Sequence, residues 1–173
     1  LYDSNKTEKN WKIFERKALA NMYFYTLSGC GARPGDELLN LQLKDIIQEE
    51  RKSFNQVDNP HAYVSTFNMN IRSGKMSKRG GARIIPTPQK FEDYMFRYAM
   101  YVADPDDSHY EYIEKNQNKY LFGFGDKDSV NKNFYEKYFN TARETLIEQK
   151  KLRSDVKIVP YSFRHTYVTF ALV

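Results

Sequence analysis

The sequence predicts a mainly α-helical fold with one small antiparallel β-sheet, in the α+β class. Two observations indicate it: several segments place apolar residues every three or four positions, and one pair of alternating segments flanks a glycine-containing turn. A chain of 173 residues is long enough for one domain with a substantial core. We therefore expect a single domain over residues 1–173.

The first predicted helix runs from about Glu8 to Leu27, where large apolar residues recur at helical spacing. Gly29 and Gly31 should end it. The residues that define its apolar face are Trp11, Phe14, Ala18, Met22 and Tyr25.

A second helix is expected in the segment ARPGDELLNLQLKDI. Pro34 suits a first helical turn, and Asp36 and Glu37 suit the positive end of the helix dipole. Arg33 would then stand just before a helix start. The apolar face of this helix would consist of Leu38, Leu39, Leu41 and Leu43.

A hairpin is predicted in the middle of the chain. The polar residues 48–59 should form a loop, after which apolar and polar residues alternate from Tyr63 to Ile71. The turn segment SGKMSKRGG and the short segment ARIIP follow. Strand, turn and strand in this order predict a hairpin with a basic tip.

The second half of the chain is expected to be helical. Residues 91–102 have helical spacing, DPDDSHYEY from Asp104 should be a solvated loop, and a further helix should run from a cap at Ser129 to about Lys150. The apolar segment 162–173 should be a helix without a stop signal, so we expect the chain to end inside that helix.

Composition narrows the class of protein. Hydrophobic residues make up 40% and aromatic residues 16% of the chain, which excludes a disordered protein and favours a core of rings with polar tips. We find neither an apolar run long enough to span a bilayer nor a signal-peptide pattern, so a cytoplasmic protein is expected. Cys30 is the single cysteine and the three histidines are scattered, so we predict a core thiol and no metal site.

The charge favours an anionic partner. The net charge is +5 and the pI about 9.1, although many proteins this basic bind no nucleic acid. A basic cluster without an acid lies in the predicted hairpin. Its members, which we predict to contact DNA, are Arg72, Lys75, Lys78, Arg79 and Arg83.

Three basic residues stand where backbone geometry would fix a side chain: Arg33 before a helix, Lys78 beside a tight turn and Arg164 at the start of the last helix. An arginine fork grips two phosphate oxygens, and a lysine can also give up a proton, so the set suits phosphoryl transfer. Each residue alone also fits an ordinary surface charge. Arg164 lies among aromatic and β-branched residues, where a buried charge needs a partner.

Three motifs together resemble the tyrosine recombinases, or phage integrases. GARPGDELLNLQLKDI resembles the family's first arginine box, with Arg33 and Asp36 in its two charged places. SKRGGARIIP resembles the hairpin that carries the catalytic lysine, which would be Lys78. YSFRHTYVTF resembles the second arginine box, with Arg164 as its arginine.

The resemblance implies site-specific DNA recombination, the integration or excision of a mobile element through a 3′-phosphotyrosyl intermediate. Arg33 and Arg164 would grip the scissile phosphate, and Lys78 would protonate the departing 5′-hydroxyl. The reaction needs no metal or other cofactor. Its implied partner is double-stranded DNA in the nucleoid, with four protomers on two duplexes.

Two departures from the family pattern matter. Tyr161 stands where the family usually has a histidine; it can hydrogen-bond a phosphate or pack in the core, but it cannot carry a proton near neutral pH as histidine can. The family's nucleophilic tyrosine lies further beyond Arg164 than the nine residues here, and Tyr167 is too close. We therefore expect this chain to bind DNA without cleaving it. A non-enzymatic DNA-binding relative and a helical protein-interaction domain remain as alternatives.

Overall fold

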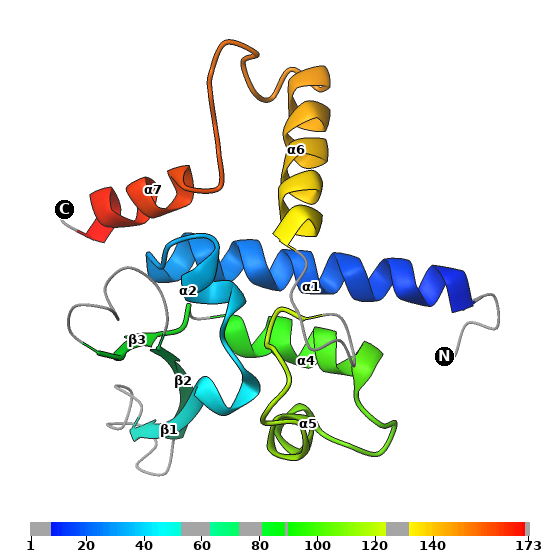
Figure 1. Ribbon diagram of the computed structural model, residues 1–173, viewed down its shortest axis with the longest axis vertical. Helices are drawn as coiled ribbons and strands as arrows, with labels where there is room; N and C mark the ends of the chain where they lie inside the picture. The colour runs from blue at the N-terminus through cyan, green and yellow to red at the C-terminus, as the bar shows by residue number, and fades with distance from the viewer. Residues whose placement is uncertain (1–7, 53–62, 73–80, 89, 124–131, 172–173) are drawn as a thin grey trace.

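A computed structural model describes residues 8–52, 63–72, 81–88, 90–123 and 132–171, and its elements gather around one long helix, α1 (Figure 1). α1 has 23 residues, so it is about 35 Å long at 1.5 Å per residue. In chain order the elements are α1 (Glu8–Cys30), α2 (Asp36–Leu39), η1 (Leu43–Asp45), β1 (Ile46–Lys52), β2 (Tyr63–Ile71), β3 (Arg83–Pro86), α4 (Phe91–Val102), α5 (His109–Lys115), α6 (Lys132–Glu148) and α7 (Ser162–Ala171).

The architecture is mainly helical with one three-stranded antiparallel sheet, as the sequence predicts. α4 packs along α1, and α7 packs against the C-terminal end of α1 (Figure 1). α6 packs against α1 through aromatic side chains. Phe24 of α1 lies 5.8 Å from Phe139 and 6.3 Å from Tyr138 of α6, measured between ring centroids. None of the described helices is both long and apolar enough to cross a membrane.

The sheet has the order β1-β2-β3, with Met69 of β2 opposite Ile46 on one side and Ile85 on the other. Its central strand has the predicted bounds, and β2 and β3 pair antiparallel as the predicted hairpin requires. The alternation of β2 turns Phe67, Met69 and Ile71 into the core. The tip of the hairpin, residues 73–80, lies outside the described residues.

The predicted loop over residues 48–59 is wrong at its start, because β1 continues through Lys52. The polar composition of this segment concealed a strand. Among the residues that the structure describes, β1 pairs with β2 alone and so forms an edge of the sheet, where charged side chains are common. Backbone pairing with β2, rather than an apolar pattern, defines it.

The helix predicted to start near Pro34 is also shorter than expected. α2 is a single turn, and the chain beyond it leaves the helical path. The backbone of Leu41 accepts a hydrogen bond from Leu121 N at 2.8 Å, and Leu43 N donates to Lys119 O at 2.9 Å. This pairing with a distant segment replaces the hydrogen bonds that a longer helix would make.

The predicted solvated loop at DPDDSHYEY contains a helix, α5, which is a third correction. Ser108 caps it: its hydroxyl accepts from Glu111 N, and the Glu111 carboxylate accepts from Ser108 N at 2.7 Å. This reciprocal capping box satisfies amide groups at the helix start. The other helices lie near their predicted bounds, although α1 continues through Gly29 to Cys30, and the predicted cap at Ser129 lies outside the described residues.

The core is built from rings with bonded polar tips, as predicted. The hydroxyl of Tyr98 donates to Gly123 O at 3.0 Å, and that of Tyr135 donates to Phe122 O at 2.6 Å. Cys30 is a buried core residue, and burial raises the pKa of its thiol to about 11. These two tyrosines therefore place their rings in the core with their hydroxyls hydrogen-bonded.

Candidate nucleic-acid interface

The loop between α1 and α2 positions the first predicted arginine. Gly31 and Gly35 have φ of 64° and 92°, a left-handed conformation that favours glycine. At Gly31 a β-carbon would also overlap the ring of Tyr167 from α7. The loop therefore turns sharply at the point where α7 rests, and Arg33 follows two residues later.

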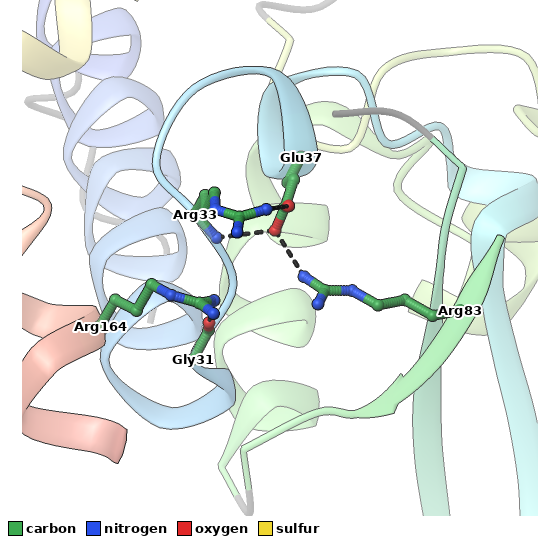
Figure 2. Close-up of polar contacts among 5 residues, drawn as sticks. All are labelled: Gly31, Arg33, Glu37, Arg83 and Arg164. Carbon is green, nitrogen blue, oxygen red and sulfur yellow. Dashed lines mark hydrogen bonds and ion pairs between the residues drawn. The ribbon is translucent and has the colours of Figure 1, made fainter. Parts of the chain in front are cut away.

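A buried carboxylate, Glu37, holds two arginines. It is 2% exposed, and its oxygens accept from Arg33 Nη1 at 2.8 Å, from Arg33 backbone N at 2.9 Å and from Arg83 Nη2 at 2.6 Å. Figure 2 shows its carboxylate between the two guanidinium groups, one from the loop before α2 and one from β3. Residues from separate parts of the sequence thus meet at one acid.

The cluster presents positive charge to solvent. The side chains of Arg33 and Arg83 are 29% and 35% exposed, whereas Glu37 is covered, so two positive charges share one buried negative charge. The pKa of the Arg33 guanidinium is raised above its usual value, with the hydrogen bond to Glu37 as the main cause and Tyr161 as the next. Within the described residues, the buried Nε of Arg83 has no hydrogen-bond partner.

Arg164 reaches the same place from α7. Its side chain is half-buried, and Nη1 donates to the carbonyl oxygen of Gly31 (Figure 2). A backbone oxygen, not a carboxylate, is the acceptor, so the full positive charge of Arg164 is kept. We name Arg33, Arg83 and Arg164 the arginine cluster.

Tyr161 lies at the surface beside this cluster. It is 40% exposed, it contributes after Glu37 to the raised pKa of Arg33, and its ring stands edge-on to His165 at 5.1 Å between centroids. It also borders a pocket of about 210 Å³ that reaches Gly35 and α6. Of the two roles left open for Tyr161, core packing does not fit this position.

The remaining predicted DNA contacts are not gathered here. Arg72 forms a two-pronged ion pair with Asp45 of η1, with N to O distances of 2.5 and 2.8 Å. Lys75, Lys78 and Arg79 lie outside the described residues. The structure therefore brings together four of the predicted residues, namely Arg33, Arg83, Tyr161 and Arg164.

Glu37 was missed as a site residue. Sequence reasoning gave the acidic place to Asp36, which is exposed, whereas the next residue is buried and binds the arginines. Spacing could not decide between them, since residues three and four apart both meet across a helical turn, so Asp36 and Glu37 suit Arg33 equally. The second partner, Arg83, depends on the tertiary fold, so local spacing could not indicate it.

Comparison with known proteins adds no assignment: searches against protein families, curated proteins and solved structures find no match for this chain.

Proposed function

We propose that this chain binds duplex DNA through the arginine cluster and forms part of the catalytic domain of a tyrosine recombinase. The observation that carries the proposal is the meeting of Arg164 with Gly31, across 133 residues of sequence, directly beside Arg33. The two arginines that the sequence motifs pair as phosphate ligands are thus neighbours in space. Tyr161, the residue in the histidine place of the motif, is near enough to Arg33 to help raise the pKa of its guanidinium.

The geometry supports a preorganised phosphate site. Each guanidinium has five N–H donors, and the bonds of Arg33 to Glu37 and of Arg164 to Gly31 fix the groups while leaving donors over. In the proposed reaction Arg33 and Arg164 bind the non-bridging oxygens of the scissile phosphate. Donors that are already oriented stabilise the charge that grows on these oxygens in the transition state.

The other predicted residues have supporting roles in this proposal. The Tyr161 hydroxyl donates to a phosphate oxygen. Lys78 of the hairpin protonates the leaving 5′-oxygen. The attacking tyrosine is not among the residues that we assign.

DNA binding is tested by fluorescence anisotropy with a labelled duplex of about 30 base pairs, titrated between about 50 and 200 mM salt. We expect affinity to fall steeply with salt. Arg33→Ala and Arg164→Ala should each weaken binding and reduce the slope of log K against log salt by about one. The matched control is Arg153→Ala, because Arg153 is exposed and pairs with Asp155 in the segment between α6 and α7.

The outcome that contradicts DNA binding at this site is equal affinity and slope for the three variants and the parent chain. The chemistry needs its own test, with protein expressed from the complete gene and a nicked duplex that traps the covalent intermediate. An adduct on a denaturing gel, lost in Arg33→Ala, supports the recombinase. Arginine-dependent binding without an adduct would leave a DNA-binding protein and end the proposal of strand transfer.

A further inference from the structure

A groove of about 610 Å³ lies toward the other end of α1, between that helix, α4 and the segment that leads to α5. Its apolar wall includes Trp11, Phe96, Met100 and Tyr101, and its rim includes Asp104 and Asp107. We name it the acid-rimmed groove. Trp11 and Gly31 are 20 residues apart, so the groove and the arginine cluster are separated by about 30 Å along the helix.

Two large apolar side chains stand open to solvent in this groove. Phe96 is 51% exposed and Met100 is 63% exposed, and their four-residue spacing places them on one face of α4. They do not complete the core, which α4 reaches through Phe91, Met95 and Tyr98. Exposed aromatic and methionine side chains of this kind are typical of protein-binding surfaces.

The wall of the groove is held in place by the fold. Trp11 Nε1 donates to Tyr101 O at 3.2 Å, and the two rings meet edge-to-face at 5.0 Å. Phe96 stands edge-on to His109 at 5.7 Å. A preformed groove binds more tightly than one that must first be ordered, because less conformational entropy is lost.

The segment that forms α4 and continues into α5 is acidic, in a chain of net charge +5. Residues 92–115 contain seven carboxylates against Arg97 and Lys115, while the α1 wall adds Lys12 next to Trp11. Asp107 is paired with Lys115 at 2.5 Å, whereas Asp104 and Asp106 are exposed in the rim segment. Such a field repels DNA phosphates and attracts lysine and arginine.

We propose that the acid-rimmed groove is a docking site for a basic segment of a partner protein. The segment seats one large apolar side chain against Phe96 and Met100, while lysines or arginines beside it meet Asp104 and its neighbours. The carboxylates of the groove would repel nucleic acid, so charge complementarity favours a basic segment. A free polyamine is also basic, but it has no large apolar side chain to cover Phe96 and Met100. This inference is independent of the proposed function, because it uses none of the arginine cluster.

The test selects peptides from a random 12-residue display library on the immobilised chain, and then measures the affinity of the winning peptide by anisotropy. We expect a consensus of lysine or arginine around one aromatic or leucine residue. Phe96→Ser with Met100→Ser should weaken that peptide by roughly tenfold or more, as should Asp104→Lys with Asp106→Lys. These positions are exposed, so the variants should keep the melting temperature of the parent.

Glu144→Lys with Glu148→Lys is the matched control, since it makes the same charge change on exposed positions of α6. The control should bind the peptide within about twofold of the parent. A library that yields no consensus, an acidic or neutral consensus, or a peptide that the groove variants bind normally would overturn the proposal. Concentration-dependent dimers of the free chain that the Phe96 and Met100 changes abolish would overturn it too, because the occupant would then be a second copy.

Discussion

The two ends of α1 use carboxylates in opposite ways. At its C-terminal end Glu37 is 2% exposed and is held by Arg33 and Arg83, so the acid is covered and the positive charge faces outward. Near its N-terminal end Asp104 is exposed beside the apolar side chains of the groove. The comparison shows that the position of an acid in the fold, more than the number of acids, decides the sign of the surface.

The largest expected difference between the two ends follows from removing Glu37. Glu37→Gln leaves two arginines around a neutral amide, and breaking a buried ion pair in this way costs about 3–5 kcal/mol. Because both arginines are partly exposed, we expect a loss of about 2–4 kcal/mol in the free energy of unfolding. Urea denaturation measures it.

Asp104→Asn supplies the control at the other end, with the same loss of one negative charge. Asp104 is exposed, so its replacement should change the free energy of unfolding by no more than about 0.5 kcal/mol. Equal losses for the two variants would contradict the comparison, because they would show that Glu37 acts through net charge alone.

A second prediction concerns Gly31, on which α7 rests. Gly31→Ala places a β-carbon in the ring of Tyr167 and in a left-handed backbone, so we expect a loss of about 2–3 kcal/mol. Gly81→Ala is matched, because Gly81 has φ of 87° but open space around the added carbon. That control should cost only the backbone strain of about 1–2 kcal/mol.

Hydrogen exchange distinguishes the two glycines. Gly31→Ala should raise exchange in residues 162–169 above the parent level, since α7 must move to admit the new carbon, while Gly81→Ala should leave that helix protected. Unchanged protection of α7 in Gly31→Ala would refute the idea that this glycine seats Arg164.

The long elements could be predicted from the sequence because their local pattern agrees with their environment. α4 and β2 both have their predicted bounds, and Phe67, Met69 and Ile71 of β2 enter the core. Where a segment is stabilised by distant backbone pairing, prediction was wrong: β1 is polar, and α2 stops where Leu41 pairs with Leu121. The composition of a segment does not show which distant segment its backbone will pair with.

The residues of the candidate site also fall into two groups, those that the sequence indicates and one that only the fold reveals. Arg33 and Arg164 were chosen because each stands at a predicted helix start, Arg83 because it belongs to a basic cluster, and Tyr161 because of the family resemblance. Glu37 could not be chosen over Asp36, because both fit a first helical turn and only the fold buries one of them. The partners of a charge depend on tertiary packing, which residue type and spacing do not encode.

A third prediction uses the buried thiol at the arginine end. The pKa of Cys30 is about 11 in the folded chain and near 8.5 when unfolded, so the thiol contribution to stability is present below about pH 8.5 and is lost as pH rises toward 11. We expect the free energy of unfolding to fall by about 1–2 kcal/mol between about pH 8 and pH 10.

Denaturation of Cys30→Ala over the same pH range isolates this effect. Its alkaline loss should be smaller than that of the parent by the thiol contribution, and the native parent should resist thiol-labelling reagents until it unfolds. Rapid labelling of the native chain at pH 8 would contradict the burial of Cys30.

The smallest expected effect tests the groove end. Ser108→Ala removes the cap of α5, which lies beside the acidic rim, and loss of such a cap costs about 1 kcal/mol. Because α5 lies at the groove end and Glu37 at the arginine end, we expect the DNA affinity and its salt dependence to stay unchanged. Thermal unfolding and anisotropy on the same sample measure both properties, and a loss of DNA affinity with Ser108→Ala would show that the two ends are coupled.

Lowering the pH provides a second test of the capping interaction at Ser108. Hydrogen bonds from Ser108 N and Oγ lower the pKa of Glu111, so the carboxylate's contribution is present above its unfolded pKa near 4.3 and is lost as pH falls through the lower folded value. The stability difference between Ser108→Ala and the parent should therefore narrow below about pH 4. A difference that stays constant from pH 7 to pH 3 would mean that the serine hydroxyl acts only through its bond to the Glu111 amide and not through the Glu111 carboxylate.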